Sequence, residues 1–322
     1  MLDKIQEPIK SELAELENRF TSLIKSEIEI INRIFTYIVA AKGKRVRPML
    51  LFLCSGLTGK PTEKSYEAAL IVELLHTATL IHDDVVDNSD LRRGRPSVNS
   101  LWENKISVLI GDFLFAEVLN RLNKLNSPRM VEIVSSVTKQ MSQGELLQME
   151  RAHDFQMNED TYFQLISNKT ASLIAATCQL GALTSQGADA THVENLRTFG
   201  ESLGIAFQIK DDLLDFYGNE KDLGKPIGKD LLENIITLPV LYGLKKSNEK
   251  SRKEILAILQ NGKDHSLDKI IHFARETGGI DYAEATAQHY IQIAQECMER
   301  YSDSPYKKSL TLLSDFITSR EM

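Results

Sequence analysis

The sequence has little of what marks a secreted, disulfide-bonded or membrane-spanning protein. It contains only three cysteines, Cys54, Cys178 and Cys297, which are far apart and in no paired spacing. We therefore expect buried free thiols in a reducing compartment, and neither a disulfide framework nor a cysteine metal site. The longest apolar runs, such as residues 48–57, fall well short of the ~20 residues that span a bilayer.

The sequence also lacks a positive charge balance, and its first residues do not resemble a signal peptide. The formal net charge is −7, whereas a general nucleic-acid-binding protein needs a basic surface. Residues 1–10 carry mixed charges and lack the apolar stretch of a signal peptide. We therefore expect a cytoplasmic protein with no transmembrane segment and no nucleic-acid partner.

Strand-like alternation is nearly absent, and helical periodicity covers most of the chain. Prolines and most glycines fall between the periodic segments, and no linker, low-complexity stretch or full-length repeat is present. These features predict an all-α fold, a single domain over residues 1–322, with shorter peripheral helices over 246–322. The longer helices are predicted at residues 9–41, 47–58, 63–88, 99–125, 128–150, 159–186, 189–217 and 232–246.

Two copies of the pattern D-D-x-x-D lie near the ends of two predicted helices. Their members are Asp83, Asp84 and Asp87 in the first motif and Asp211, Asp212 and Asp215 in the second. The outer acids of each motif are four residues apart, so they share a helix face and repel each other without a counter-charge. Hard oxygen ligands with this open spacing suit Mg²⁺, which keeps several waters and bridges to substrate phosphates. The alternative is a pair of solvated acidic helix ends, although apolar residues precede both motifs.

In each helix, earlier residues lie on the same face as the motif, in one stripe that includes a residue two turns before the last acid. The stripes are His76, Leu80, Asp83 and Asp87 in one helix and Gly204, Gln208, Asp211 and Asp215 in the other. If both stripes face one cavity, six carboxylates could hold a cluster of metal ions around a single diphosphate. The sequence therefore predicts a polynuclear Mg²⁺ site.

Four segments resemble the trans-isoprenyl diphosphate synthases, the all-trans polyprenyl diphosphate synthase family. They are GKRVRP (43–48), ELLHTATLIHDDVVDNSDLRRGRPS (73–97), NKTASLIAA (168–176) and FQIKDDLLDF (207–216). Order and spacing match from about residue 40 to 245, the expected catalytic core. The resemblance implies long, mostly antiparallel helices around a deep central cavity, usually in a homodimer. It also implies that Mg²⁺ assists the joining of isopentenyl diphosphate to an allylic diphosphate by ionisation, condensation and proton loss.

The resemblance assigns basic and polar residues to two diphosphate subsites. For isopentenyl diphosphate these are Lys44, Arg47, His76 and Arg93; for the allylic diphosphate they are Arg92, Lys169, Thr170, Gln208 and Lys225. From the residues alone, Lys44 and Arg47 could equally be surface charge, and Lys169 a snorkelling helix lysine. The expected catalytic set consists of Asp83, Asp87, Asp211, Lys169 and Arg92.

One departure from the family pattern affects the allylic subsite. Many relatives carry Gly-Lys before the Thr-Leu-Pro found here at 237–239, and that lysine also reaches the allylic diphosphate. This chain has Asn234 and Ile235 there instead, and Lys229 could compensate only in part. The departure removes one expected cation from the subsite.

Chain length is predicted from two small residues, Ala78 and Thr79, which stand five and four residues before Asp83. Short-chain relatives carry a bulky aromatic in this pair, so small residues favour a medium- or long-chain product, such as the side chain of a quinone. Ordinary helix packing would explain the same residues. A product of that kind would also allow peripheral membrane contact for its release.

Four alternatives stay open. A short-chain synthase would make farnesyl or geranylgeranyl diphosphate with the same motifs. A class I terpene cyclase usually replaces the second motif, and a non-catalytic subunit of a heteromeric synthase would be expected to lose both. The sequence does not separate a homodimer from the catalytic half of a two-protein synthase.

Overall fold

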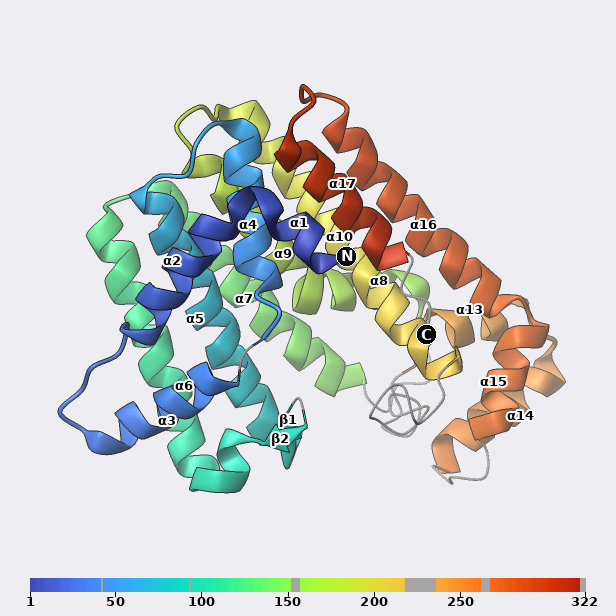
Figure 1. Ribbon diagram of the computed structural model, residues 1–322. Helices are drawn as coiled ribbons and strands as arrows, with labels where there is room; N and C mark the ends of the chain where they lie inside the picture. Colours follow the sequence, from blue (N-terminus) through green and yellow to red (C-terminus); the bar gives the residue numbers. More distant parts are fainter. Residues whose placement is uncertain (42, 93, 152–156, 218–235, 262–266, 319–322) are drawn as a thin grey trace. The chain divides into compact units, whose positions relative to one another are not determined.

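The computed structural model describes residues 1–41, 43–92, 94–151, 157–217, 236–261 and 267–318. Within these ranges helices dominate (Figure 1). The strands of the described residues form one small antiparallel hairpin, in which Leu91–Arg92 (β1) pairs with Arg95–Pro96 (β2). The predicted all-α fold is confirmed.

The helices include long central ones, and shorter ones toward both ends of the chain. They are α1 (Leu2–Gln6), α2 (Lys10–Thr21), α3 (Glu29–Ala40), α4 (Val46–Thr58), α5 (Glu63–Val86), α6 (Val98–Leu125), α7 (Pro128–Arg151), α8 (Glu159–Ile166), α9 (Ser172–Leu183), α10 (Ala190–Tyr217), α13 (Leu238–Lys246), α14 (Glu249–Asn261), α15 (Leu267–Glu276), α16 (Gly279–Met298) and α17 (Pro305–Thr318). A 3₁₀ turn, Glu7–Ile9, precedes α2, and a π-helical turn, Ser167–Ala171, joins α8 to α9.

The prediction of one helix over residues 9–41 is wrong in its middle, because α2 ends at Thr21 and α3 begins only at Glu29. Asn32 explains the break: its Oδ1 accepts from the Ser26 backbone N–H at 2.9 Å, and its Nδ2 donates to the Ser26 carbonyl at 2.7 Å. Such bonds offer the backbone a partner outside a helix. Apolar periodicity therefore continues through a segment that is not helical.

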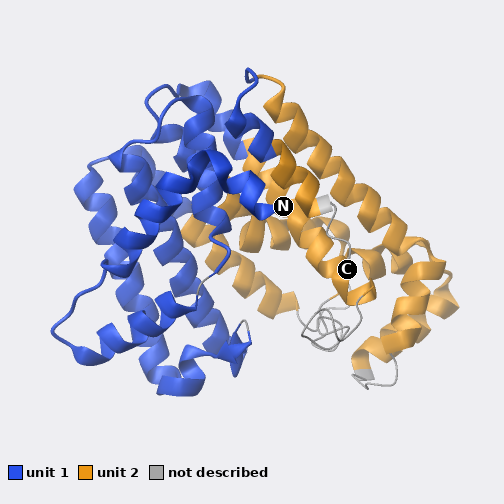
Figure 2. Ribbon diagram, in the orientation of Figure 1, with its two compact units in different colours: residues 1–136, 176–197, 301–310 blue, residues 137–175, 198–300, 311–322 orange. Residues whose placement is uncertain are grey.

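The chain forms two compact units, coloured separately in Figure 2. Unit 1 comprises residues 1–136, 176–197 and 301–310, and unit 2 comprises residues 137–175, 198–300 and 311–322. The first aspartate motif belongs to unit 1 and the second to unit 2. A single domain over residues 1–322 stays a prediction.

The core of unit 1 is built on α4 and the middle of α5. Most of α4 is buried, and every α5 residue from Ala68 to Leu75 is buried. Burying one large apolar side chain contributes ~1.5–3 kcal/mol, so these two helices anchor the unit. A capping box between Thr62 and Ser65 satisfies backbone donors at the start of α5.

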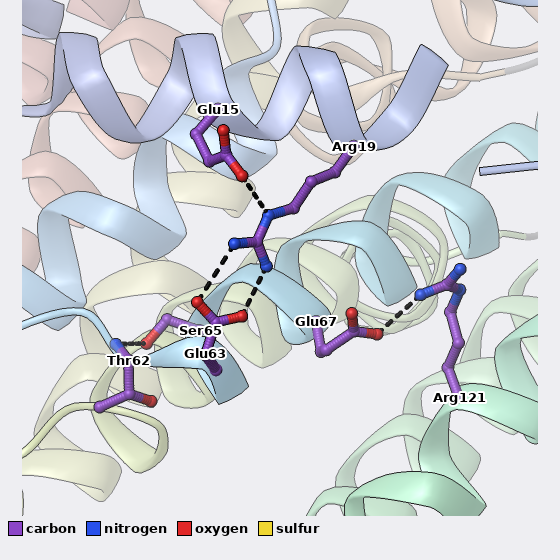
Figure 3. Close-up of polar contacts among 7 residues, drawn as sticks. All are labelled: Glu15, Arg19, Thr62, Glu63, Ser65, Glu67 and Arg121. Atoms are coloured by element: carbon purple, nitrogen blue, oxygen red, sulfur yellow. Dashed lines mark hydrogen bonds and ion pairs between the residues drawn. The ribbon is translucent and has the colours of Figure 1, made fainter. Parts of the chain in front are cut away.

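Ion pairs on both sides fix the first turns of α5, as Figure 3 shows. From α2, Arg19 Nη1 lies 2.7 Å from Glu63 Oε2, and Arg19 Nε lies 2.7 Å from Glu15 Oε1. From α6, Arg121 Nη1 lies 2.7 Å from Glu67 Oε2. The helix that ends in the first motif is therefore held at its beginning.

The core of unit 2 places the second motif. Ile209, Leu213 and Phe216 of α10 are buried in an apolar cluster with residues of α8, α13, α15 and α16. Asp211, by contrast, is exposed, and Asp215 is half-buried. The outer acids therefore lie off the face with which α10 packs.

Two further expectations concern the thiols and the membrane. All three cysteines are free and buried, and burial raises the pKa of the Cys54 thiol, so the prediction of buried free thiols is confirmed. Among the described residues, no helix combines the length and apolar character needed to cross a bilayer.

Candidate active site

The first motif lies at the C-terminal end of α5. Asp83 is half-buried, and Asp87 is exposed at the C-cap, where its backbone N–H donates to the Asp83 carbonyl. Asp87 keeps a right-handed helical backbone, with φ −81° and ψ −2°, so the helical register continues to the last acid. The shared face predicted for Asp83 and Asp87 is therefore present.

The middle acid of this motif is held by the protein itself. Asp84 is 3% exposed. Its Oδ1 accepts from Arg92 Nε at 2.8 Å and lies 2.5 Å from Arg92 Nη2. The sequence assigned Asp84 to the metal and Arg92 to a diphosphate, whereas the structure brings these two side chains together as a partly buried ion pair.

The hairpin that carries Arg92 is attached to α3 and α6. The Tyr37 hydroxyl donates to the Pro96 carbonyl at 2.7 Å, and the Arg95 guanidinium carbon lies 4.6 Å from the centroid of the Tyr37 ring. Trp102 meets the same ring edge-on, at 5.3 Å between centroids. This aromatic contact fixes β1 and β2 beside the end of α5.

The remaining residues assigned to isopentenyl diphosphate in unit 1 differ in exposure. Lys44 is exposed, whereas Arg47 in the first turn of α4 and His76 in α5 are half-buried. Ala78 is fully buried in the core of the unit. Thr79 is half-buried, and its hydroxyl donates to the His76 carbonyl at 2.9 Å.

The second motif in unit 2 also has a buried middle acid. Asp212 is 4% exposed, its Oδ2 accepts from the Tyr162 hydroxyl at 2.6 Å, and its Oδ1 accepts from Gln208 Nε2 at 2.8 Å. Thr170 Oγ1 in turn donates to Gln208 Oε1 at 2.7 Å. Thr170 and Gln208, predicted separately, therefore belong to one hydrogen-bonded network that ends on the motif.

Lys169 lies in the π-helical turn before α9, a local irregularity that is frequent at functional sites. Its Nζ is 2.8 Å from Glu145 Oε1 and 2.9 Å from Gln148 Oε1, both in α7. Gly144 allows the close approach, because a Cβ there would lie 2.9 Å from the Lys169 backbone nitrogen. Lys169 is thus an anchored cation and not a freely snorkelling lysine.

Several predicted residues lie outside the described ranges. They are Arg93, Lys225 and Lys229, together with Asn234 and Ile235, where the chain departs from the family pattern. Sequence reasoning in turn missed Tyr162, Glu145 and Gln148, which hold predicted residues in place. No local signal would have found Tyr162, which precedes its partner Asp212 by 50 residues.

The donor set fits Mg²⁺ as a metal shared with a substrate. Within the described part of the chain, no three His, Cys, Asp or Glu side chains gather into a group that could hold a metal ion. Each motif instead offers outer carboxylates on one helix face and keeps its middle one buried. Such an open set suits an ion that takes its other ligands from water and phosphate.

Comparison with known proteins gives the class of the chain. Residues 28–274 match the family described as polyprenyl synthetase. The chain belongs to that family and is a prenyltransferase of isoprenoid biosynthesis. The matched range contains both aspartate motifs and every basic residue assigned above.

Named relatives cover nearly the whole chain. Heptaprenyl diphosphate synthase component 2 of Geobacillus stearothermophilus is 35% identical over 97% of this chain and 97% of its own. Octaprenyl diphosphate synthase of Haemophilus influenzae is 34% identical over 97% of this chain and 95% of its own. The crystal structure of a decaprenyl diphosphate synthase from Rhodobacter capsulatus matches with a TM-score of 0.93 at 33% identity, covering 99% of both chains. The relatives thus include synthases named for medium- and long-chain products.

Proposed function

We propose that the chain joins isopentenyl diphosphate to an allylic diphosphate, such as geranyl or farnesyl diphosphate, and releases a medium- or long-chain all-trans polyprenyl diphosphate. The observation that carries the proposal is the common arrangement of the two motifs. In each, the outer acids are accessible or half-buried, and the middle acid is buried and held by protein donors. Such motifs are built to offer two carboxylates to a ligand from a rigid helix.

In this proposal Asp83 and Asp87, and likewise Asp211 and Asp215, hold Mg²⁺ against the allylic diphosphate. The metal, when bound, neutralises charge that develops on the leaving diphosphate. Arg92 and Lys169 supply positive charge to the same group. Each is already paired with a carboxylate in the structure, so its side chain is fixed before the substrate arrives.

Lys44, Arg47 and His76 bind isopentenyl diphosphate in this scheme, together with Arg93. As the carbon–oxygen bond of the allylic substrate breaks, the double bond of isopentenyl diphosphate attacks the allylic carbon. The product then loses a proton, which the released diphosphate can accept. Because no protein base is needed, the role of the protein is to bind and orient the two substrates and to stabilise the charge that develops.

Product length is proposed from Ala78, Thr79 and the names of the relatives. Heptaprenyl and octaprenyl synthases are among them, but so is a short chain isoprenyl diphosphate synthase of Methanothermobacter thermautotrophicus, 33% identical over 91% of each chain. The small pair at 78 and 79 favours the longer products, with a quinone side chain as the proposed use. A short-chain product is the second candidate.

We also propose that the chain acts in the cytoplasm, with peripheral membrane contact for product release, and that it associates through α6. This helix exposes Leu101, Val108, Leu109 and Leu119, with 41–67% of each residue accessible. Such an apolar surface indicates a partner. The proposed partner is a second copy of the chain. Because two relatives are named as component 2 of a heptaprenyl diphosphate synthase, a different subunit is the alternative.

The test is product analysis with the purified chain, isopentenyl diphosphate, farnesyl diphosphate and Mg²⁺. The proposal is supported if elongated all-trans products form only when isopentenyl diphosphate, farnesyl diphosphate and Mg²⁺ are all present. Release of diphosphate from farnesyl diphosphate alone would indicate a terpene cyclase. The mass of the purified chain, measured by light scattering, separates the homodimer from a chain that needs a second protein for activity.

A further inference from the structure

The three cations of residues 43–48 have different surroundings. Lys44 is exposed and Arg47 begins α4, but Arg45 between them turns inward. Arg45 Nη1 lies 2.7 Å from Glu73 Oε2 on α5, and Arg45 Nε lies 3.2 Å from Glu17 Oε2 on α2. Its guanidinium is therefore already engaged by two carboxylates.

The backbone at Arg45 is unusual for an arginine. As the N-cap of α4 it adopts φ 48° and ψ 39°, in the left-handed region that residues with a Cβ seldom occupy. Such a conformation persists only where the surroundings enforce it. The two ion pairs, and the Phe20 ring 4.5 Å from the guanidinium carbon, supply that constraint.

Glu73 gives the contact its importance, because this residue is only 7% exposed. A buried carboxylate without a cation would be costly, so Arg45 and Glu73 stabilise each other. Burial alone would lower the pKa of Arg45, but Glu73 and then Glu17 raise it above its ordinary value. Glu73 stands three residues before His76 on α5. The pair therefore ties the start of α4, where Lys44 and Arg47 flank Arg45, to the helix that carries His76.

We propose that Arg45 is a positioning residue: it fixes Lys44 and the first turn of α4, which carries Arg47, against α5, and so sets the affinity for isopentenyl diphosphate without touching it. The inference rests on the proposed function, because it takes these two cations and His76 as the isopentenyl subsite. It predicts that loss of Arg45 affects one substrate and not the other.

Arg19 provides a matched control in the same unit. It extends from α2 to α5, pairs with Glu15 and Glu63, and lies over an aromatic ring, 4.4 Å from the Tyr66 centroid (Figure 3). Its partner Glu63, however, is in the first turn of α5, away from His76. Arg19→Ala should therefore remove similar packing without moving residues 43–48.

The experiment compares Arg45→Ala, Arg45→Lys, Glu73→Gln and Arg19→Ala with the unmodified full-length chain. Initial rates give KM for each substrate, calorimetry gives isopentenyl diphosphate binding in the absence of turnover, and thermal unfolding gives stability. Arg45→Ala should weaken isopentenyl diphosphate about tenfold, the scale of a small misplacement of binding groups, and leave the allylic KM within about twofold. Arg45→Lys keeps the charge but cannot contact both carboxylates in the same way. Its affinity for isopentenyl diphosphate should therefore lie between those of the unmodified chain and Arg45→Ala.

Glu73→Gln should show the same selective loss of affinity for isopentenyl diphosphate, because it removes the negative charge that pairs with Arg45. Arg19→Ala should lower the unfolding temperature but leave both KM values unchanged. Equal changes in both KM values, or a change in stability alone across the Arg45 and Glu73 variants, would overturn the inference. If Arg45→Ala does not fold, Arg45→Lys and Glu73→Gln carry the test. An unmodified chain that fails to consume isopentenyl diphosphate would instead refute the proposed function, which the variants do not address.

Discussion

The two aspartate motifs have the same pattern of letters but are supported differently. In unit 1 the middle acid, Asp84, is paired with a cation, Arg92, which a hairpin supplies eight residues later. In unit 2 the middle acid, Asp212, accepts from the hydroxyl of Tyr162 and the amide of Gln208. The first motif therefore includes its own counter-charge, whereas the described donors to Asp212 are uncharged.

This difference indicates what organises each motif. At the first motif, the ion pair with Arg92 holds the middle acid, Asp84. At the second motif, hydrogen bonds from Tyr162 and Gln208 orient Asp212. We therefore expect the first motif to be organised largely by Arg92, and the second to depend on the hydroxyl of Tyr162 and the amide of Gln208.

The largest expected effect comes from the outer acids, because both motifs place two of them on one helix face. Replacing Asp83 and Asp87 together with Ala, or Asp211 alone, should lower turnover by about 10³-fold or more, because the groups that neutralise the leaving diphosphate lose their ligands. Circular dichroism should show unchanged helicity. Asp90→Ala, an exposed acid just beyond the first motif, is the control. Turnover close to normal in the Asp83/Asp87 double variant would remove the basis of the mechanism.

The next effect separates the two diphosphates. Lys169→Ala should raise KM for the allylic substrate about tenfold, and Arg47→Ala should raise that for isopentenyl diphosphate by a similar factor, because each removes charge-assisted contacts. Glu145→Gln tests the anchoring of Lys169, since it weakens the 2.8 Å ion pair without removing the cation. Initial-rate kinetics with each substrate varied in turn measures all three. Interchangeable defects in the Lys169 and Arg47 variants would show that the subsites are wrongly assigned.

A smaller effect addresses the support of the second motif directly. Tyr162→Phe removes the hydroxyl that donates to Asp212, and a hydrogen bond to a charged group contributes ~1.5–3 kcal/mol to the free energy of unfolding. Turnover should fall severalfold because Asp212 loses one of its donors. Urea unfolding and initial rates provide the measurements. The control is Tyr290→Phe, because Tyr290 packs against the same apolar cluster. Equal effects of the two substitutions would mean that the Tyr162 contact has no particular role.

The contrast between the motifs also shows what the sequence could predict. The helices at 47–58, 63–88, 128–150 and 189–217 each match an observed helix to within two residues at either end, because periodicity and caps are local signals. The helix at 99–125 matches at both ends, but α6 is kinked at Glu103, where φ is 69° and ψ is 158°. The four-residue spacing likewise predicted that Asp83 and Asp87 share a face. The supports of Asp212 and Lys169 come from Tyr162 and Glu145, which lie 50 and 24 residues away along the chain. Such contacts depend on how helices pack, which spacing does not encode.

The smallest effect on the first condensation is expected from substitutions that change product length, and these extend the comparison to the residues that precede each motif. Four residues before Asp83 stands Thr79, whereas four residues before Asp211 stands Phe207. We expect the growing chain to run along α5, past the small residue, and not along α10. Thr79→Phe should then shorten the main product while the first condensation continues, and Phe207→Ala should leave product length unchanged.

The structure shows which of the two small residues gives the cleaner test. Ala78 is fully buried, so a phenylalanine there would overpack the core of unit 1, at a cost of ~1–3 kcal/mol in stability. Thr79 is half-buried, so a larger side chain can extend outward. A penalty of the same ~1–3 kcal/mol, applied to a prenyl chain that meets the ring introduced by Thr79→Phe, would slow further elongation about tenfold to a hundredfold. Chromatography of the dephosphorylated products measures this. A shorter product from Phe207→Ala, or an unchanged one from both Thr79→Phe and Ala78→Phe, would place the chain-length determinant on a helix other than α5.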